Sequence, residues 1–224
     1  MFEIFGITFH WYGLLIGLGV WISIEIALSH RGKIDKDQLE KAIFWVIIAG
    51  VIGARLYHVI DYWNRYYSSN LIKVIYVWEG GLGIWGAIGG GILALIIYCF
   101  VKKIRFLKYL DALVVGVPLA QAIGRVGNYI NGELYGKNGE PLFAYEGILN
   151  IILFAILWKI SGKHKKIGVI SGVYLIGYGL IRGILENLRP EEIVWKLYGV
   201  PAAIVFSCLA IISGIYLIFR RKQS

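Results

Sequence analysis

The stretch that decides the fold is GGLGIWGAIGGGILALIIYCFVKK, residues 80–103. Residues 80–101 carry no charged side chain, and Lys102 and Lys103 follow directly. About 20 consecutive apolar residues are enough for a helix to cross the hydrocarbon core of a bilayer. The stretch therefore predicts a membrane-spanning helix that ends at the polar boundary marked by the two lysines.

Runs of the same kind recur along the chain. Of the 224 residues 58% are hydrophobic and only 17% are charged, and the mean hydropathy is +0.68. A soluble domain does not need this composition, because its surface faces water. We expect an all-α polytopic membrane protein with seven transmembrane helices, at about residues 7–28, 41–60, 80–101, 109–125, 143–160, 167–188 and 201–219.

These helices are expected to form a single transmembrane domain over residues 1–224, with two short segments at the outer interface. The first covers about residues 61–78, where aromatic and polar side chains alternate as they do in chain that lies at the membrane surface. The second covers about residues 126–142.

Basic residues fall mainly on alternate connectors of the expected helices. Fifteen of the 23 Lys and Arg residues lie in or beside the connectors 29–40, 102–108 and 161–166 and the tail 220–224. Connectors rich in Lys and Arg stay on the cytoplasmic side of a membrane. We therefore expect the N-terminus outside, with no signal-peptide pattern before the first span, and the C-terminus in the cytoplasm.

Other protein classes fit poorly. A net charge of +9 suits nucleic acid, but these basic residues punctuate apolar runs instead of covering a solvated face with interleaved aromatics. Cys99 and Cys208 both lie inside apolar runs, so we expect neither a disulfide framework nor a thiolate metal site.

Three arginines, Arg55, Arg125 and Arg182, lie inside or at the edge of expected spans. A charge inside a bilayer is costly, so each needs a partner or a purpose. At 1.5 Å per residue, each lies about 21–25 Å from a cytoplasmic lysine of its own helix, which is the level of the outer headgroups. Arginine suits a phosphate there because it offers paired, permanently charged donors.

The sixth span carries a polar stripe spaced four, four and three residues apart along one helix face: Tyr178, Arg182, Glu186 and Arg189. An ion-pair ladder that holds the helices together and a ligand site explain this stripe equally well. Arg55 and His58 also share a helix face, where an ion pair with a glutamate would explain Arg55 without any substrate.

The strongest local signal is GRVGNYINGELYG, residues 124–136. It gathers one cation, two amides and one carboxylate at the outer end of the fourth span: Arg125, Asn128, Asn131 and Glu133. Its four glycines allow the backbone to bend and to approach a ligand closely. The stretch therefore predicts a polar ligand site.

This stretch closely resembles the signature of the prolipoprotein diacylglyceryl transferases, the family that starts bacterial lipoprotein lipidation. The resemblance extends over most of the chain, at His10–Gly13, Gly53–Leu56, Trp78–Gly81, Asp111, Pro141, Tyr145–Glu146 and Tyr178–Arg189. It implies a seven-span protein of the bacterial cytoplasmic (inner) membrane with its N-terminus outside, which agrees with the topology expected from charge.

The resemblance also implies a reaction. The thiol of a lipobox cysteine, in the signal peptide of a prolipoprotein, attacks the glycerol carbon of phosphatidylglycerol, so that a thioether forms and glycerol phosphate leaves. The implied partners are phosphatidylglycerol, the prolipoprotein and the lipid bilayer, with no nucleic acid. No cofactor and no metal is implied.

By matching the family's two arginines, the resemblance assigns Arg125 and Arg182 to the phosphate. The expected catalytic residues are Arg125, Arg182, Tyr12, Glu133 and His58. The expected phosphatidylglycerol-binding residues are Arg125, Arg182, Asn128, Asn131, Gly136, Tyr178 and Arg55. The expected supporting residues are His10, Asp111, Glu146, Glu186 and Arg189.

Trp85 departs from the family pattern. Many members have a histidine at this position that is credited with base catalysis, and tryptophan cannot accept that proton. Three explanations stay open: His58 or Glu133 is the base, the phosphate and the arginines activate the thiol, or the chain is a catalytically silent homologue that binds phosphatidylglycerol. A lipid or solute transporter is a further alternative, although the sequence shows no inverted repeat.

Overall fold

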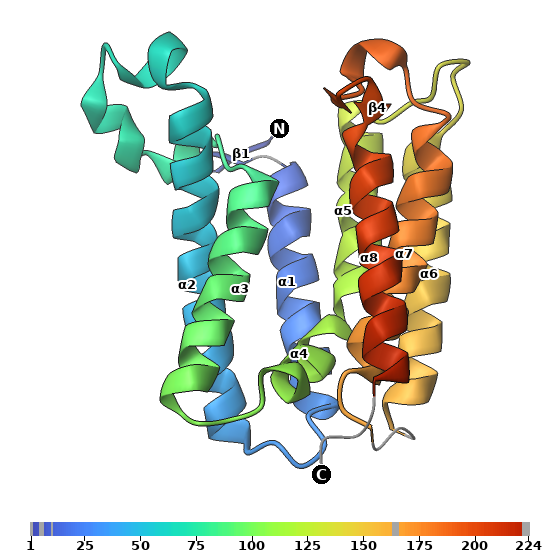
Figure 1. Cartoon of the computed structure of the whole chain (residues 1–224). Coiled ribbons are helices and arrows are strands. Elements are labelled where there is room, and N and C mark those ends of the chain that lie inside the picture. The colour runs from blue at the N-terminus through green and yellow to red at the C-terminus, as the bar shows by residue number, and fades with distance from the viewer. Residues whose placement is uncertain (1, 5–6, 10, 163–165, 221–224) are drawn as a thin grey trace. The chain divides into compact units, whose positions relative to one another are not determined.

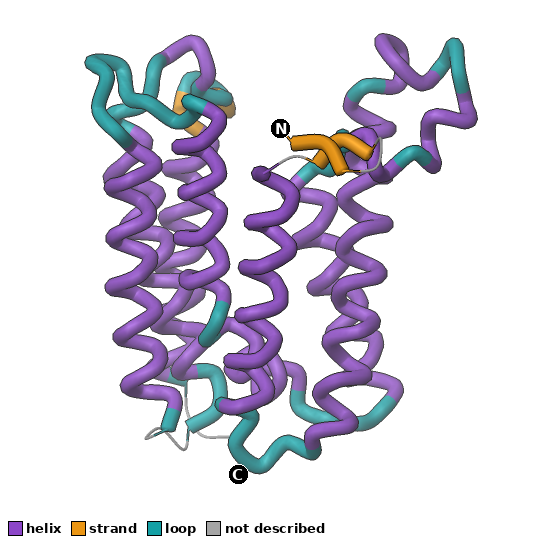
Figure 2. Tube along the Cα trace, turned by 180° about the vertical axis from the view of Figure 1, so that it is seen from behind, coloured by secondary structure: helices purple, strands orange, loops and turns teal. Residues whose placement is uncertain are grey.

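A computed structural model of the chain describes residues 2–4, 7–9, 11–162 and 166–220 (Figure 1). Besides helices it contains two antiparallel hairpins (Figure 2). The first pairs β1 (Phe2–Ile4) with β2 (Ile7–Phe9), and the second pairs β3 (Lys196–Leu197) with β4 (Val200–Pro201). His10, expected as a supporting residue, lies outside the described residues.

Six helices in the described part of the chain are long and apolar enough to cross a membrane. They are α1 (Trp11–Ser29), α2 (Lys36–Asp61), α3 (Ile84–Val101), α6 (Leu142–Ser161), α7 (Val169–Glu186) and α8 (Ala202–Phe219). The pair α4 (Phe106–Val114) and α5 (Val117–Asn131), bent by 42°, adds a seventh if it forms one span. A polytopic helical membrane protein is thereby confirmed, while the count of seven and the orientation of the termini stay predictions.

The fourth span differs from the straight helix expected over residues 109–125. Pro118 lies in the first turn of α5, where it lacks the N–H that a continuing helix needs and clashes with the preceding turn. The helix therefore breaks after Val114. It then runs on to Asn131, so residues 126–131, expected in an interface segment, are helical, and Gly132 ends the helix with a left-handed φ of 70°.

Two other helices begin later than expected. The first starts at Trp11 instead of residue 7, because residues 7–9 form a strand. The third starts at Ile84 instead of residue 80, because Gly80 and Gly81 have φ values of 88° and 69°, which a helix does not allow.

The segment expected at the outer interface, residues 61–78, consists of short helical turns. A π-helical turn, η1 (Trp63–Tyr67), is followed by the 3-10 turns η2 (Leu71–Ile75) and η3 (Val77–Glu79). Large apolar side chains such as Leu71 and Trp78 are exposed there, which is compatible with the predicted place at a membrane surface.

The chain divides into two compact units, residues 1–32 with 107–224 and residues 33–106. The single transmembrane domain stays a prediction. In the second unit α2 packs against α3 through glycines: a Cβ on Gly53 or Gly86 would collide with the backbone carbonyl of the other. Small residues let membrane helices approach this closely.

In the first unit α5 packs between α1 and α6, and α7 packs between α6 and α8. Its apolar core joins several of these helices through Ile26, Val115, Leu142, Leu157 and Ile181. This row of helices positions the polar groups that follow.

Asp111 on α4 fixes the start of α7. Its carboxylate accepts hydrogen bonds from the backbone N–H groups of Gly168 (2.5 Å) and Ser171 (2.9 Å) and from the Ser171 hydroxyl (2.6 Å). A carboxylate at this end satisfies helix donors that lack partners and meets the positive end of the helix dipole. Any effect of Asp111 on activity stays a prediction.

Candidate functional site

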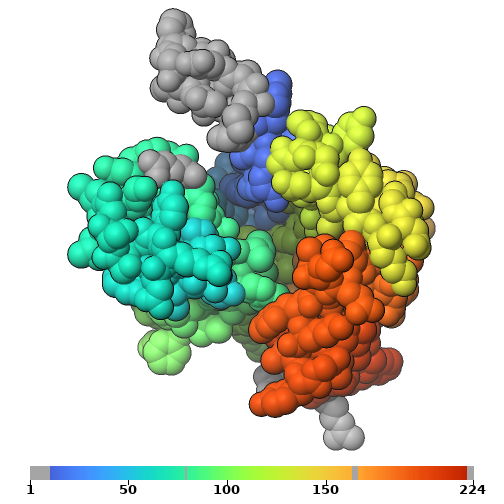
Figure 3. Space-filling model, turned by 90° about the horizontal axis from the view of Figure 1, so that it is seen from above, coloured from blue at the N-terminus to red at the C-terminus, as the bar shows by residue number. Residues whose placement is uncertain are grey.

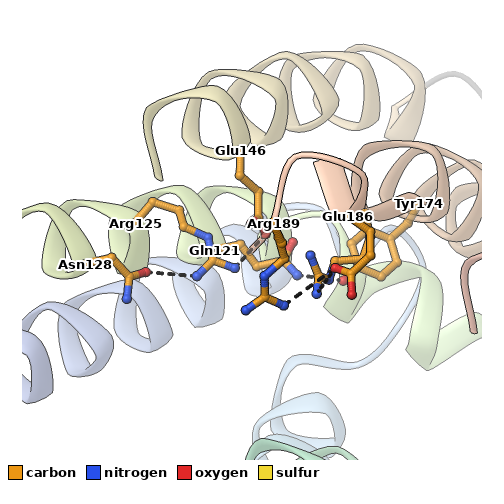
Figure 4. A network of polar contacts seen from close by, with 8 residues as sticks. Gln121, Arg125, Asn128, Glu146, Tyr174, Glu186 and Arg189 are labelled. Carbon is orange, nitrogen blue, oxygen red and sulfur yellow. Dashed lines mark hydrogen bonds and ion pairs between the residues drawn. The ribbon is translucent and has the colours of Figure 1, made fainter. Parts of the chain in front are cut away.

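Two glutamates are buried inside the first unit. Glu146 on α6 is 3% exposed and Glu186 on α7 is 4% exposed. A carboxylate removed from water needs a cationic partner or several hydrogen bonds. Glu146 Oε1 lies 2.6 Å from Arg125 Nη2 (Figure 4), and Glu186 Oε2 lies 2.7 Å from Arg182 Nη2.

Arg125 is the first member of a continuous chain of polar contacts. Its Nη1 donates to Asn128 Oδ1 at 2.9 Å, and the Asn128 amide donates to Glu133 Oε2 at 3.1 Å. The Asn131 amide donates to the other Glu133 oxygen at 3.3 Å. Glu146, Arg125, Asn128, Glu133 and Asn131 are therefore linked, from a buried carboxylate to an exposed one.

Local sequence explains this arrangement. Arg125 and Asn128 are three residues apart on α5, so they share a face. The left-handed Gly132 then turns the chain back, and the Glu133 N–H bonds to the Asn128 carbonyl at 2.8 Å. Tyr12 of α1 packs on the same helix at Gly127, where a Cβ would lie 2.6 Å from the tyrosine ring.

The polar stripe on α7 contributes the second ion pair. Glu186 lies between Arg182 and Arg189, whose Nη1 is 3.6 Å away. Tyr178 interacts electrostatically with Glu146, Arg125 and Arg182. The stripe is thus an ion-pair ladder, and through Tyr178 it also faces the ion pair of Arg125 on α5 and Glu146 on α6.

Gly136 lies in the loop between α5 and α6, which is exposed at one end of the unit (Figure 3). A Cβ on Gly136 would collide with the Glu140 carboxylate and lie 2.9 Å from the Leu188 carbonyl. The side chain and backbone of Asn138 hydrogen-bond to Glu140 and lower the pKa of its carboxyl. Gly136 is needed for loop packing, and its contact with phospholipid stays a prediction.

Three polar residues near the ion pairs are absent from the sequence-based assignment. Gln121 donates from Nε2 to the Tyr174 hydroxyl at 3.2 Å (Figure 4), and the Tyr174 ring stacks on Tyr178. Asn150 is fully buried on α6. The available signal was spacing, because Gln121 precedes Arg125 and Asn150 follows Glu146 by one helical turn.

Arg55 belongs to the second unit and has no carboxylate partner among the described residues. Its guanidinium donates to four backbone carbonyls, those of Lys73 (2.5 Å), Val74 (2.9 Å), Gly80 (2.6 Å) and Gly81 (3.1 Å). Arg55 is only 7% exposed. The contacts show how it holds residues 73–81, and the binding of phosphatidylglycerol by Arg55 stays a prediction.

His58 lies one turn further along the same helix. Its Nδ1 is 2.9 Å from the Tyr67 hydroxyl, and its ring stacks on Tyr62 with the centroids 4.5 Å apart. Trp85 lies in the first turn of α3 and is 47% exposed. His58 is thus part of an aromatic cluster in the second unit.

The first unit gathers three guanidinium groups around two buried carboxylates. With these two carboxylates alone one unit of positive charge remains, and the exposed Glu133, joined to Arg125 through Asn128, offsets it. The paired guanidinium donors are therefore what suits an anion such as a phosphodiester. In the described part of the chain no three His, Cys, Asp or Glu side chains converge as metal ligands.

Comparison with known proteins identifies relatives of the whole chain. Residues 1–220 match the family model described as prolipoprotein diacylglyceryl transferase. A phosphatidylglycerol–prolipoprotein diacylglyceryl transferase from Finegoldia magna is 34% identical and aligns over 99% of this chain and 95% of its own. Proteins of the same name from Streptococcus uberis (34% identical, 96% and 92% covered) and Thermosynechococcus vestitus (33% identical, 96% and 89% covered) are similar.

Proposed function

The chain belongs to the prolipoprotein diacylglyceryl transferase family, and we infer that it is a transferase that moves the diacylglyceryl group of phosphatidylglycerol onto prolipoproteins. Its relatives are named for this activity, and they align over almost its full length. The observation that supports the location of the reaction is the cluster of ion-paired arginines in the first unit.

The reaction makes one bond and breaks one. The thiol of the lipobox cysteine, in the signal peptide of the prolipoprotein, attacks the carbon of the diacylglycerol part that carries the phosphate. A carbon–sulfur bond forms, the carbon–oxygen bond breaks with its electron pair on oxygen, and glycerol phosphate leaves. The thiol proton passes to a base, so the site must hold phosphate, stabilise the leaving oxygen and accept one proton.

Arg125 and Arg182 hold the phosphate in this proposal. Each is fixed by a buried glutamate, Glu146 or Glu186, and Arg189 adds a third cation beside Glu186. Negative charge on the phosphate grows as the carbon–oxygen bond breaks. Guanidinium groups that are already in place stabilise that charge more strongly in the transition state than in the bound lipid.

The residues around Arg125 suit the glycerol headgroup. Asn128 and Asn131 present amides, and Tyr12 and Tyr178 present hydroxyls, from α5, α1 and α7. Groups of these kinds bind the hydroxyls of a polar headgroup without adding charge. We assign them to the headgroup.

Glu133 is the proposed general base. It is exposed, its two oxygens accept hydrogen bonds from Asn128 and Asn131, and the Asn128 contact connects it to Arg125. A base must lie within hydrogen-bond reach of the proton it takes. His58 remains the competing base, with one ring nitrogen beside Tyr67.

The membrane arrangement completes the proposal. If α4 and α5 form one span, the chain crosses seven times. The basic connectors favour an N-terminus outside and a C-terminus in the cytoplasm. The signature residues then lie at the outer face of the bacterial cytoplasmic membrane, where phosphatidylglycerol and the lipobox cysteine meet.

Thioether formation tests the proposed function. Purified protein in phosphatidylglycerol vesicles is incubated with a lipobox peptide, and mass spectrometry detects the diacylglyceryl adduct. We expect adduct with the natural chain and with Arg105→Ala, a control at an exposed arginine on the expected cytoplasmic side. We expect almost none with Arg182→Ala or in vesicles of phosphatidylcholine alone.

The fate of the lipid, followed in the same vesicles, separates the alternatives. A catalytically silent homologue, the reading motivated by Trp85, retains phosphatidylglycerol but yields no adduct with any peptide. A transporter moves intact lipid and releases no glycerol phosphate.

A further inference from the structure

Several side-chain polar atoms in the first unit are buried without a hydrogen-bond partner among the described residues, and four of them belong to neighbouring positions on α5 and α6. These four are Arg125 Nε, Gln121 Oε1, and the oxygen and nitrogen of the Asn150 amide. Asn150 itself is 0% exposed. Buried polar groups in native proteins almost always have a partner, and ordered water supplies it where protein does not.

These atoms lie at one place between α5 and α6. Arg125 and Glu146 join the two helices at 2.6 Å, and a short loop over residues 132–141 connects them, so the helices run antiparallel. Four residues back along α5 is Gln121, and four residues forward along α6 is Asn150. Each step is one helical turn in the same direction on the same face, so the two amides lie opposite one another below the ion pair.

The contacts of neighbouring residues support this placement. Asn150 belongs to the buried stripe of α6 that contains Leu142, Glu146, Leu153 and Leu157. Gln121 uses its nitrogen for the Tyr174 hydroxyl, which leaves its oxygen as the buried acceptor (Figure 4).

The four atoms match what water needs. Arg125 Nε–H and the Asn150 nitrogen are donors, whereas Gln121 Oε1 and the Asn150 oxygen are acceptors. A buried water typically makes about three hydrogen bonds to such groups. We propose that Gln121 and Asn150 hold ordered water against Arg125 Nε, and that both act as positioning residues for the transfer reaction.

This role rests on the proposed function of Arg125. Its Nη1 and Nη2 each make one contact, to Asn128 and to Glu146. Water on Nε fixes the remaining edge of the guanidinium, so the free Nη hydrogens keep one direction toward a phosphate. Loss of that water lets the guanidinium group rotate. Its stabilisation of the transition state then becomes weaker although its charge is retained.

The test is a double-mutant cycle. Gln121→Leu and Asn150→Leu each replace the hydrogen-bonding groups on one side of the water site by methyl groups, and both are combined in a third variant. We expect kcat to fall about tenfold in each single variant, about 1.4 kcal/mol, with KM for phosphatidylglycerol within about twofold. The double variant should also fall about tenfold, because one site is lost only once.

Two further variants are the controls. Asn150→Ser keeps a polar group and leaves room for water, so its kcat should remain within about twofold of the natural chain. Ser207→Ala removes a different buried hydroxyl without a described partner, on α8, and should leave kcat unchanged. A loss of about 100-fold in the double variant, or unchanged kcat in both single variants, overturns the proposal.

Thermal unfolding in detergent separates this inference from the proposed function. If the natural chain makes no adduct at all, the proposed function fails, but the water site is still read from the midpoints. Each single variant should then unfold at least a few degrees lower, and the double variant no lower than the worse single variant. Additive losses contradict a shared water.

Discussion

Arg125 and Arg55 are both arginines inside apolar helices, yet their partners differ in kind. Arg125 in the first unit faces a carboxylate and a side-chain amide, Glu146 and Asn128. Arg55 in the second unit faces four backbone carbonyls that belong to residues 73–81. We expect a guanidinium held by side chains to retain N–H donors for a phosphate, whereas one whose nitrogens all donate to backbone carbonyls stabilises the fold.

The largest expected effect tests the first half of this comparison. Arg125→Ala should lower the rate of transfer on the order of 10³-fold, because it removes a preorganised donor at the developing negative charge. The measurement is the initial rate of adduct formation in phosphatidylglycerol vesicles. A loss below about tenfold would show that Arg125 serves only the ion pair with Glu146.

The choice of base sharpens the comparison. Glu133→Gln keeps the size of the side chain and removes the proton acceptor, so kcat should fall about 10²-fold. His58→Gln should change kcat by less than about twofold, because His58 belongs to the aromatic cluster of the second unit. The pH–rate profiles of both variants decide between them, and a large loss only in the His58 variant would reverse the assignment.

The second half of the comparison predicts a loss of stability. Arg55→Met removes hydrogen bonds from a buried charged donor and should cost about 3 kcal/mol of folding free energy, or roughly 6–12 °C in unfolding midpoint. Residues 71–81 should become sensitive to trypsin at Lys73. Arg65→Met, at an exposed arginine of the same unit, is the matched control. Unchanged cleavage at Lys73 would contradict the role of Arg55.

The smallest effect concerns the loop between α5 and α6. Hydrogen bonds from Asn138 lower the pKa of Glu140 below its ordinary value of 4.5. A carboxyl whose pKa is lower in the folded state than in the unfolded state stabilises the folded state at pH values above its unfolded pKa. This contribution disappears as the pH falls through the folded pKa. Hydrogen exchange of residues 136–140 should therefore speed up, at matched intrinsic rates, as the pH falls below 4.5. Glu140→Gln should remove this pH dependence, and a variant that retains it would contradict the account.

The sequence predicts the membrane-spanning helices well because hydropathy depends on composition over about 20 residues. The break before α5 is also written in the sequence, because Pro118 marks it. A search for unbroken apolar runs does not detect this break, since proline is itself compatible with the first turn of a helix. Residues 126–131 were expected outside the span, because the search for apolar runs ended that span at residue 125.

The partners of the buried arginines are harder to predict. The carbonyls around Arg55 belong to short turns and to Gly80 and Gly81, which follow no helical or strand period. The Arg182, Glu186 and Arg189 ladder follows one helix and is predictable from spacing. Asn150 lies in an apolar run, so the sequence alone does not show which groups surround it. The contact of Arg125 with Glu146 shows that Asn150 faces α5.

Group transfer is tested most directly by counting both products in one sample. Phosphatidylglycerol labelled in its headgroup is incubated with the natural chain and a lipobox peptide, and released glycerol phosphate and thioether adduct are quantified together. The account predicts one glycerol phosphate for each adduct, and neither product with Arg125→Ala. Glycerol phosphate without adduct, or adduct that forms equally well with Arg125→Ala, would contradict it.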